Sequence, residues 1–166
     1  MKIKYRILFF CISCFVFIGC DRATKNFAKI HLMDKEPLSF LHNAVRLEYA
    51  ENTGAFLSFG AEWPKAINFW VLSVFPLLFL VGLFIYAINQ SKQINLLQML
   101  SFAFIFSGGI GNIIDRILFD RHVIDFMNVG INNIRTGIFN FADVYVTTGI
   151  ILLLINQYRK PGQKEI

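Results

Sequence analysis

Charged residues are scarce in this chain: they make up 16% of its 166 residues, whereas soluble domains carry roughly 25%. Hydrophobic residues make up 55%. This composition argues against a large water-soluble core and predicts one membrane-embedded domain over residues 1–166. The net charge of +5 does not indicate a nucleic-acid partner, because the basic residues do not gather on one candidate face.

Cysteine and histidine are also few. All three cysteines, Cys11, Cys14 and Cys20, lie in the first apolar stretch, where small buried hydrophobic side chains are a simpler interpretation than a zinc or redox pair. No disulfide framework is predicted. The three histidines are scattered through the loops without the spacing of metal ligands. We therefore expect neither a metal nor another cofactor.

Four apolar stretches predict an all-α integral membrane protein with four transmembrane helices. We place the helices at about residues 7–27, 66–90, 94–114 and 138–158. Pro76 is expected to kink the second one, which membrane helices tolerate.

Basic residues predict the orientation of these helices. Lys2, Lys4 and Arg6 precede the first helix, and further basic residues follow the fourth. Short cytoplasmic segments of membrane proteins are enriched in such residues. We therefore expect both termini in the cytoplasm and the longer connections, about 28–65 and 115–137, on the outer side.

The first apolar stretch allows a second interpretation. Ile7 to Cys20 is shorter than the roughly 20 residues of a membrane helix, and it could belong to a lipoprotein signal peptide with Cys20 as the lipid-bearing residue. We favour an uncleaved helix, because the helical pattern continues to Ala28 and three more apolar stretches follow. In that helix Asp21 and Lys25 lie four residues apart, in the order that favours an ion pair.

The connection 28–65 predicts a small β-rich cradle between the first two helices. Residues 45–50 alternate between apolar and polar side chains, as a half-exposed strand does. A turn at Glu51–Gly54 follows, and a second short strand is expected at Ala55–Phe59. The apolar side chains of this connection favour a position on the membrane surface.

Acidic residues concentrate between Gly108 and Asp143, where four of the chain's eleven lie. The predicted topology brings most of the polar candidates to the outer ends of the helices. They are Asp21, Asn52, Asn112, Asp115, Asp125, Asn140 and Asp143, whereas Asp120 is expected to be a solvated loop charge. Ionisable residues at a membrane edge indicate either an ion pathway or an acid–base site. A site open to one side is favoured, because the second predicted helix contains no ionisable residue.

Each candidate also has a purely structural interpretation. The glycines at 108, 109 and 111 allow close helix packing, with or without a substrate. Asn112, Asp115 and Arg116 share one helix face and could form a structural polar network. Asn140 and Asp143 lie three residues apart at a helix start, where Asp143 could simply be a cap.

The same residues carry a resemblance to a known family. The chain is similar to the lipoprotein signal peptidases (signal peptidase II), whose motif series it shows in order and over nearly its whole length. The motifs are Asp21-x-x-Thr24-Lys25, Asn52-x-Gly54-Ala55, Gly108-Gly109-x-Gly111-Asn112-x-x-Asp115-Arg116, Val123-Ile124-Asp125-Phe126 and Phe139-Asn140-x-Ala142-Asp143. The departures are Arg22, where Gln or Leu is common, and Ile124 in place of Val.

The resemblance implies an aspartic endopeptidase of the bacterial cytoplasmic (inner) membrane. It would remove signal peptides from diacylglyceryl-modified prolipoproteins by cleavage before the lipid-bearing cysteine, near the outer leaflet and among membrane phospholipids. The catalytic pair would be Asp125 and Asp143. Residues lining the substrate pocket would be Asn52, Gly54, Asn112, Arg116 and Asn140. Residues supporting the site would be Asp21, Lys25 and Asp115.

Two other functional classes use the same residues differently. A small membrane transporter or ion-conducting protein would show solute flux and no proteolysis. A membrane scaffold would be indifferent to loss of Asp125 or Asp143.

Overall fold

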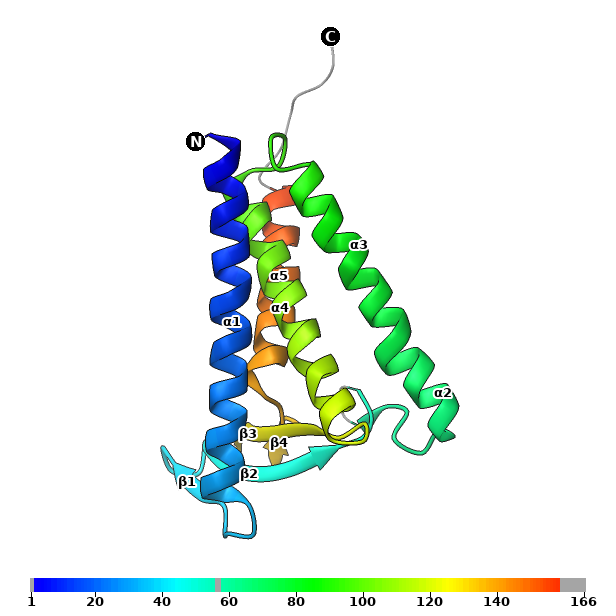
Figure 1. The fold of residues 1–166 in the computed structure, drawn as a ribbon. Helices are drawn as coiled ribbons and strands as arrows, with labels where there is room; N and C mark the ends of the chain where they lie inside the picture. Colours follow the sequence, from blue (N-terminus) through cyan, green and yellow to red (C-terminus); the bar gives the residue numbers. More distant parts are fainter. Residues whose placement is uncertain (1, 56–57, 159–166) are drawn as a thin grey trace.

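Four helices in the described part of the chain are long and apolar enough to cross a membrane. The computed structural model describes residues 2–55 and 58–158. The helices span Ile3–Leu32, Lys65–Asn89, Leu96–Leu118 and Phe141–Tyr158. The first is α1, the third α4 and the fourth α5 (Figure 1). The predicted fold class, four membrane helices with a small sheet, is confirmed.

The second membrane helix contains a π-helical turn. It consists of α2 (Lys65–Phe69), η2 (Trp70–Val74) and α3 (Phe75–Asn89). Pro76 is the second residue of α3, just after η2, and it has no backbone N–H, so the normal hydrogen-bond pattern cannot continue through the preceding turn. The sequence predicted a kink at this proline, and the structure has the π-helical turn there. Figure 1 shows that α3 is close to the other helices at the end of the bundle away from the sheet and diverges from them at the sheet end.

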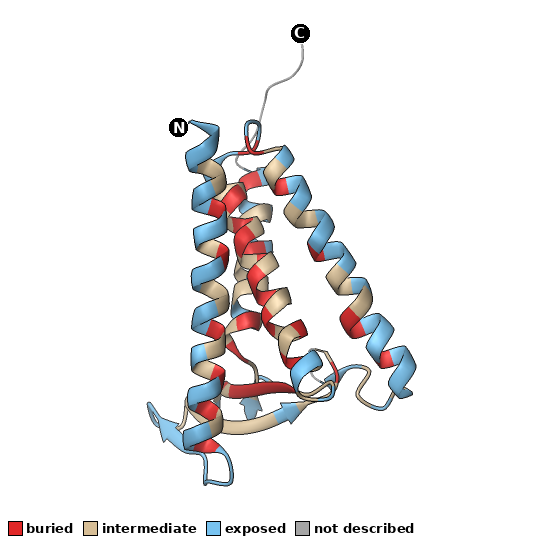
Figure 2. Cartoon of the chain, in the orientation of Figure 1, coloured by how far each residue is buried: buried red, intermediate tan, exposed pale blue. Residues whose placement is uncertain are grey.

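Side chains on the outer surfaces of these helices are apolar and exposed, as a lipid environment requires. Phe15 on α1 is 80% exposed, whereas Phe10 is fully buried among Cys14, Ala87 and Met99. Figure 2 shows the buried residues along the inner sides of the helices. Of the three cysteines, only Cys14 is buried, so the expectation of buried thiols was wrong for Cys11 and Cys20.

The first helix runs without a break from Ile3 to Leu32, well beyond Cys20. This agrees with the continuous first helix favoured from the sequence. Gly108 lies at a close contact between α4 and α5: a Cβ at this position would lie 2.3 Å from the carbonyl oxygen of Ala142. The glycine therefore lets α4 approach the start of α5.

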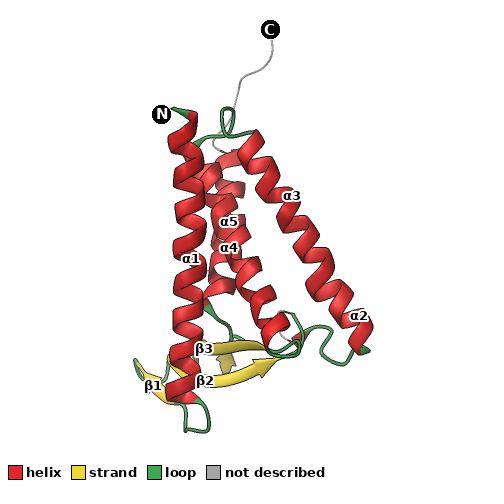
Figure 3. Cartoon of the chain, in the orientation of Figure 1, coloured by secondary structure: helices red, strands yellow, loops and turns green. Residues whose placement is uncertain are grey.

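A four-stranded antiparallel sheet lies at the end of the bundle where α1 ends and α5 begins (Figure 3). Its order is β1 (Leu38–Phe40), β2 (Val45–Asn52), β3 (Val123–Ile131) and β4 (Ile134–Arg135). The sequence predicted strands only between the first two helices, whereas β3 and β4 come from the connection between α4 and α5. Residues 123–126 are all buried, so this strand lacks the alternation that reveals a half-exposed one.

The second strand expected at Ala55–Phe59 does not form at the residues described there. Ala55 lies in a bend, Ser58 in a 3₁₀ conformation and Phe59 in a turn, and residues 56–57 fall outside the described part. β2 instead pairs with β1 and β3.

Candidate active site

Asp125 and Asp143 line one cavity of about 370 Å³ at the sheet end of the bundle. Asp125 lies on β3, and Asp143 lies in the first turn of α5. The same cavity brings together all five residues predicted to line the pocket. Four of them line its wall, namely Asn52, Gly54, Asn112 and Arg116. The fifth, Asn140, does not line the wall but donates a hydrogen bond to Asp125, which does.

Asp143 is held by the backbone at the start of its own helix. Its N–H donates to Asn140 Oδ1 at 3.0 Å, and the Asn140 N–H donates back to Asp143 Oδ2 at 3.1 Å. Such a reciprocal cap satisfies two backbone donors and suits a carboxylate at a helix N-terminus. The capping interpretation of Asp143 is therefore correct, but it uses only one carboxylate oxygen. Asp143 Oδ1 accepts from Asn112 Nδ2 at 2.9 Å.

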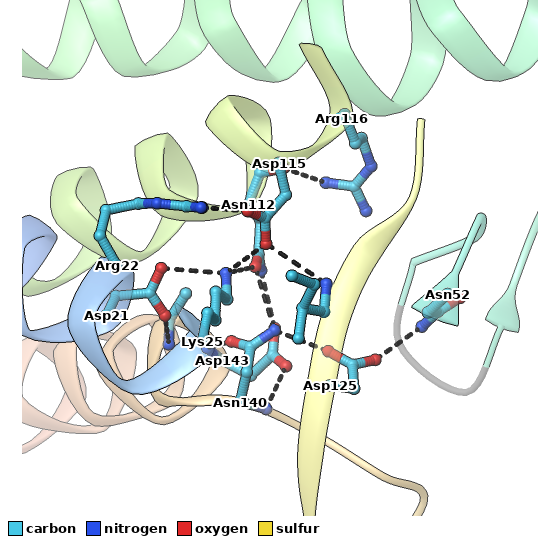
Figure 4. A network of polar contacts seen from close by, with 12 residues as sticks. Asp21, Arg22, Lys25, Asn52, Asn112, Asp115, Arg116, Asp125, Asn140 and Asp143 are labelled. Atoms are coloured by element: carbon cyan, nitrogen blue, oxygen red, sulfur yellow. Dashed lines mark hydrogen bonds and ion pairs between the residues drawn. The ribbon is translucent and has the colours of Figure 1, made fainter. Parts of the chain in front are cut away.

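Amide side chains connect the two carboxylates (Figure 4). Asn140 Nδ2 donates to Asp125 Oδ1 at 2.6 Å and to Asn112 Oδ1 at 3.2 Å. Asn52 Nδ2 donates to Asp125 Oδ2 at 3.2 Å. Because Asn112 also donates to Asp143, a chain of two asparagines runs from one aspartate to the other. The amides fix the carboxylates without neutralising them.

The environment of Asp125 favours its protonated form. The side chain is only 3% exposed. Burial, followed by the negative charge of Asp143, raises the pKa of Asp125 from 3.8 to about 6. Hydrogen bonds from Asn52 and Asn140 and the positive charge of Lys25 oppose this change. Asp125 can therefore carry a proton at pH values close to neutral.

A buried charged cluster lies behind the amides. Lys25 Nζ is 2.9 Å from Asp21 Oδ2 and 2.9 Å from Asp115 Oδ2, and all three side chains are fully buried. The predicted ion pair between Asp21 and Lys25 is present. Lys25 also donates to Asn112 Oδ1 at 2.9 Å, which links the cluster to the two aspartates.

This cluster holds the residue that precedes each aspartate of the pair. Asp21 Oδ1 accepts from the Ala142 N–H at 3.0 Å, next to Asp143. Asp115 Oδ2 accepts from the Ile124 N–H at 3.3 Å, next to Asp125. Two buried acids with one shared lysine thus position two separate segments of backbone. The supporting role predicted for Asp21, Lys25 and Asp115 has a geometric basis.

Arg22 is a member of the cluster that the sequence prediction missed. Its guanidinium forms an ion pair with Asp115 and lies over the Phe119 ring. The sequence offered one signal, since Arg22 is one of the two positions where this chain departs from the common residue of the family it resembles. The fully buried Asp115 therefore has two cationic partners, Arg22 and Lys25.

Arg116 and Gly54 join α4 to the segment after β2. Arg116 Nη2 donates to the Gly54 carbonyl at 2.8 Å, and the Gly54 N–H donates to Asn52 Oδ1 at 2.9 Å. A Cβ on Gly54 would lie 2.5 Å from the backbone of Ser58, so only glycine fits here. The predicted turn at Glu51–Gly54 thus presents Asn52 to Asp125.

Asn68 also fixes this segment and was missed. It is fully buried on α2, and its Nδ2 donates to the carbonyls of Thr53 at 2.8 Å and Gly60 at 3.0 Å. Its only sequence signal is a polar residue near the start of an apolar stretch. By contrast, Asp120 lies outside the site: it is exposed and faces Lys65 at 3.6 Å, as expected of a solvated charge.

The described residues contain no cluster of three or more His, Cys, Asp or Glu side chains that could bind a metal ion. The polar side chains that line the cavity carry carboxylates, amides, one guanidinium and the hydroxyl of Thr147. They suit proton transfer and hydrogen bonding to a peptide.

Comparison with known proteins agrees with this arrangement. The family model described as Signal peptidase (SPase) II matches residues 13–159. The chain belongs to the signal peptidase II family. This family consists of aspartic peptidases, so the predicted enzyme class and lipoprotein signal peptidase function are confirmed, and the transporter alternative is not supported.

Curated relatives of this signal peptidase II cover nearly its full length. The lipoprotein signal peptidase of Borrelia hermsii is 32% identical, with 92% of this chain and 91% of the relative covered. That of Chlorobium phaeobacteroides is 34% identical, with 89% and 88% covered. That of Streptococcus pyogenes is 33% identical, with 88% and 90% covered.

Solved structures share the fold. A bacterial membrane enzyme superposes with a TM-score of 0.78 at 23% identity, covering 95% of this chain and 93% of the other. A second bacterial membrane enzyme gives a TM-score of 0.73 at 24% identity, with 95% and 94% covered. The chain is therefore a multi-pass bacterial membrane protein.

Proposed function

We propose that this signal peptidase II hydrolyses the peptide bond before the lipid-bearing cysteine of diacylglyceryl-modified prolipoproteins, with Asp125 and Asp143 as its catalytic pair. The observation that carries the proposal is the shared cavity. The carboxylates of Asp125 and Asp143 lie on its wall and are joined by hydrogen bonds through Asn112 and Asn140. Burial and the negative charge of Asp143 raise the pKa of Asp125.

The chemistry needs one carboxylate and one carboxylic acid. The ionised aspartate takes a proton from water as the water oxygen attacks the scissile carbonyl carbon. The protonated aspartate then gives its proton to the leaving nitrogen as the C–N bond breaks, so the pair begins and ends with a single proton. The raised pKa of Asp125 supports this side chain as the one that carries the proton before the substrate binds. During turnover the proton belongs to the pair.

The surrounding polar groups orient the reactants. Asn112 and Asn140 hold the carboxylates, and Asn52 holds Asp125 from the opposite side. Arg116 has a buried Nε–H with no partner among the described residues. This donor is available to a substrate carbonyl at the cavity wall. Gly54, also on that wall, offers only backbone groups to the cavity, because the Ser58 backbone occupies the place of its Cβ.

The proposed orientation places both termini in the cytoplasm and the site near the outer leaflet. The start of α1 and the end of α5 lie at the opposite end of the bundle from the sheet (Figure 1). Lys2, Lys4 and Arg6 belong to that end and match the basic character of cytoplasmic segments. The 30 residues of α1 extend about 45 Å, so the helix can cross the roughly 30 Å hydrocarbon core and continue beside the sheet.

Cleavage by purified protein tests the proposal. The substrate is a diacylglyceryl-modified prolipoprotein, and gel or mass analysis detects the released signal peptide. Asp125→Asn and Asp143→Asn should each abolish cleavage, whereas the matched control Asp120→Asn should cleave normally because that carboxylate is exposed and outside the cavity. Near-normal turnover by either of the first two variants contradicts the assignment. Loss of activity in Asp115→Asn with retention in Asp125→Asn would instead support Asp115 and Asp143 as the pair.

A further inference from the structure

The cavity continues from the two aspartates into the membrane-spanning part of the bundle. On α5, Val146 and Thr147 line it one turn beyond Asp143. On α4, Gly109 lines it one turn before Asn112. Because α4 ends and α5 begins at the sheet end (Figure 1), both turns lie farther from the sheet than Asp143 and Asn112 do. We call this part of the cavity its inner part.

Thr147 supplies the inner part with a polar side chain. The lining residues around it are Leu72, Pro76, Gly109 and Val146, which have no polar side-chain group. Thr147 is exposed and lies about 9 Å along the helix axis from the start of α5. A hydroxyl at this depth in a membrane is costly without a hydrogen-bond partner. Its position on the cavity wall therefore calls for one.

The fold does not provide this partner among the described residues. A threonine in a helix commonly donates to a carbonyl of the preceding turn, as Thr24 does toward two carbonyls of α1 at 2.9 Å each. Within residues 2–55 and 58–158, the α5 side chains that form hydrogen bonds are those of Asp143 and Asn156. Thr147 is not one of them, so its hydroxyl is available to a ligand in the cavity.

The signal peptide of the proposed substrate needs such a partner. Its apolar segment precedes the cleavage site, so the residues before the scissile bond belong in the inner, apolar part of the cavity. A peptide whose scissile bond lies at the aspartates is not helical there, because helical hydrogen bonds would span that bond. Lipid offers the released backbone groups no partner, so the protein has to supply one.

We propose that Thr147 is a substrate-binding residue whose hydroxyl donates a hydrogen bond to a backbone carbonyl of the signal peptide. This inference rests on the proposed function and deepens it. Thr147 follows Asp143 by four residues, which is about 6 Å along the helix. An extended peptide advances about 3.3 Å per residue, so the bonded carbonyl lies two residues from the scissile carbonyl. It belongs to the third residue before the lipid-bearing cysteine, and the bond fixes the register of the peptide over the aspartates.

Cleavage of synthetic diacylglyceryl lipopeptides by the purified full-length protein tests this contact. Thr147→Val removes the hydroxyl and keeps the shape of the side chain, so kcat/KM should fall about three- to tenfold, the effect of one uncharged hydrogen bond. Thr147→Ser should restore most of it. Thr148→Val is the matched control, because this half-buried neighbour does not line the cavity, and it should cleave like wild type. Helical circular dichroism checks that each variant is folded.

A change in the substrate backbone locates the bond. One lipopeptide has an ester in place of the amide that contains the carbonyl of the third residue before the cysteine. Because an ester carbonyl is the weaker acceptor, this substrate should slow wild type several-fold more than it slows Thr147→Val, a non-additive result expected of two groups in contact. The same replacement one residue nearer the cysteine should slow both proteins equally.

Unchanged kcat/KM in Thr147→Val would overturn the proposal, and so would equal losses in Thr147→Val and Thr148→Val. Equal slowing of wild type and Thr147→Val by the first ester would overturn the contact with that carbonyl. If the effect of Thr147→Val disappears with an ether-linked dialkylglyceryl substrate, the hydroxyl binds an ester of the lipid and the peptide contact is wrong. A wild-type protein that leaves every lipopeptide intact would contradict the proposed function itself, and this contact with it.

Discussion

Replacing Asp125 by asparagine should make the free energy of unfolding less dependent on pH. In the folded protein, burial and then the charge of Asp143 raise the pKa of Asp125 from 3.8 to about 6. Below pH 3.8 this carboxyl is protonated in both the folded and unfolded chains, and it contributes its full stability. As the pH rises toward about 6 and beyond, the unfolded chain ionises first, and that stability is lost.

The difference between these pKa values corresponds to about 3 kcal/mol. Wild type should therefore lose about 3 kcal/mol relative to Asp125→Asn between pH 3.5 and pH 8. The asparagine also turns one amide donor toward Asn52 or Asn140, both of which donate to Asp125. That mismatch costs about 1–3 kcal/mol at every pH, so it shifts the curve without changing its slope.

The free energy of unfolding is measured by SDS titration in mixed micelles at a series of pH values. Asp120→Asn serves as the control, because its exposed carboxylate should give no comparable change. Asp143→Asn should reduce the pH dependence by removing the second cause of the raised pKa. A difference between wild type and Asp125→Asn that stays constant from pH 3.5 to 8 would refute the electrostatic account of the pair.

Substitutions at three further positions test the support of the site. Gly111→Ala should destabilise the protein by about 1–3 kcal/mol, because the new Cβ would lie 2.5 Å from the buried Asp21 Oδ2; the SDS titration checks this. Arg22→Gln should lower stability by about 1–3 kcal/mol, because Asp115 loses one of its two cations, and Arg22→Lys should restore part of it. Asn68→Ala should reduce cleavage with unchanged helical circular dichroism, because it frees the carbonyls that hold the segment around the cavity wall; full activity would contradict this.

The local sequence determined those features of the protein that depend on a single stretch of the chain. Long apolar runs became membrane helices because lipid offers the backbone no hydrogen-bond partners, so each run must satisfy its own. The spacing of Asp21 and Lys25 sufficed for their ion pair, and that of Asn140 and Asp143 for their cap. The motif residues already indicated the family.

Contacts between distant segments decided the rest. Asn52 and Asp125 are 73 positions apart, and only the pairing of β2 with β3 brings the amide to the carboxylate. Arg22 was an unexplained departure until α4 placed Asp115 beside it, 93 positions away. Neither position determines its partner by itself, because a buried charge or amide is stabilised by whichever group the fold brings within bonding distance. The amino-acid sequence supplied the reacting groups and the membrane helices, and tertiary packing determined which amides and cations hold the two aspartates in one cavity.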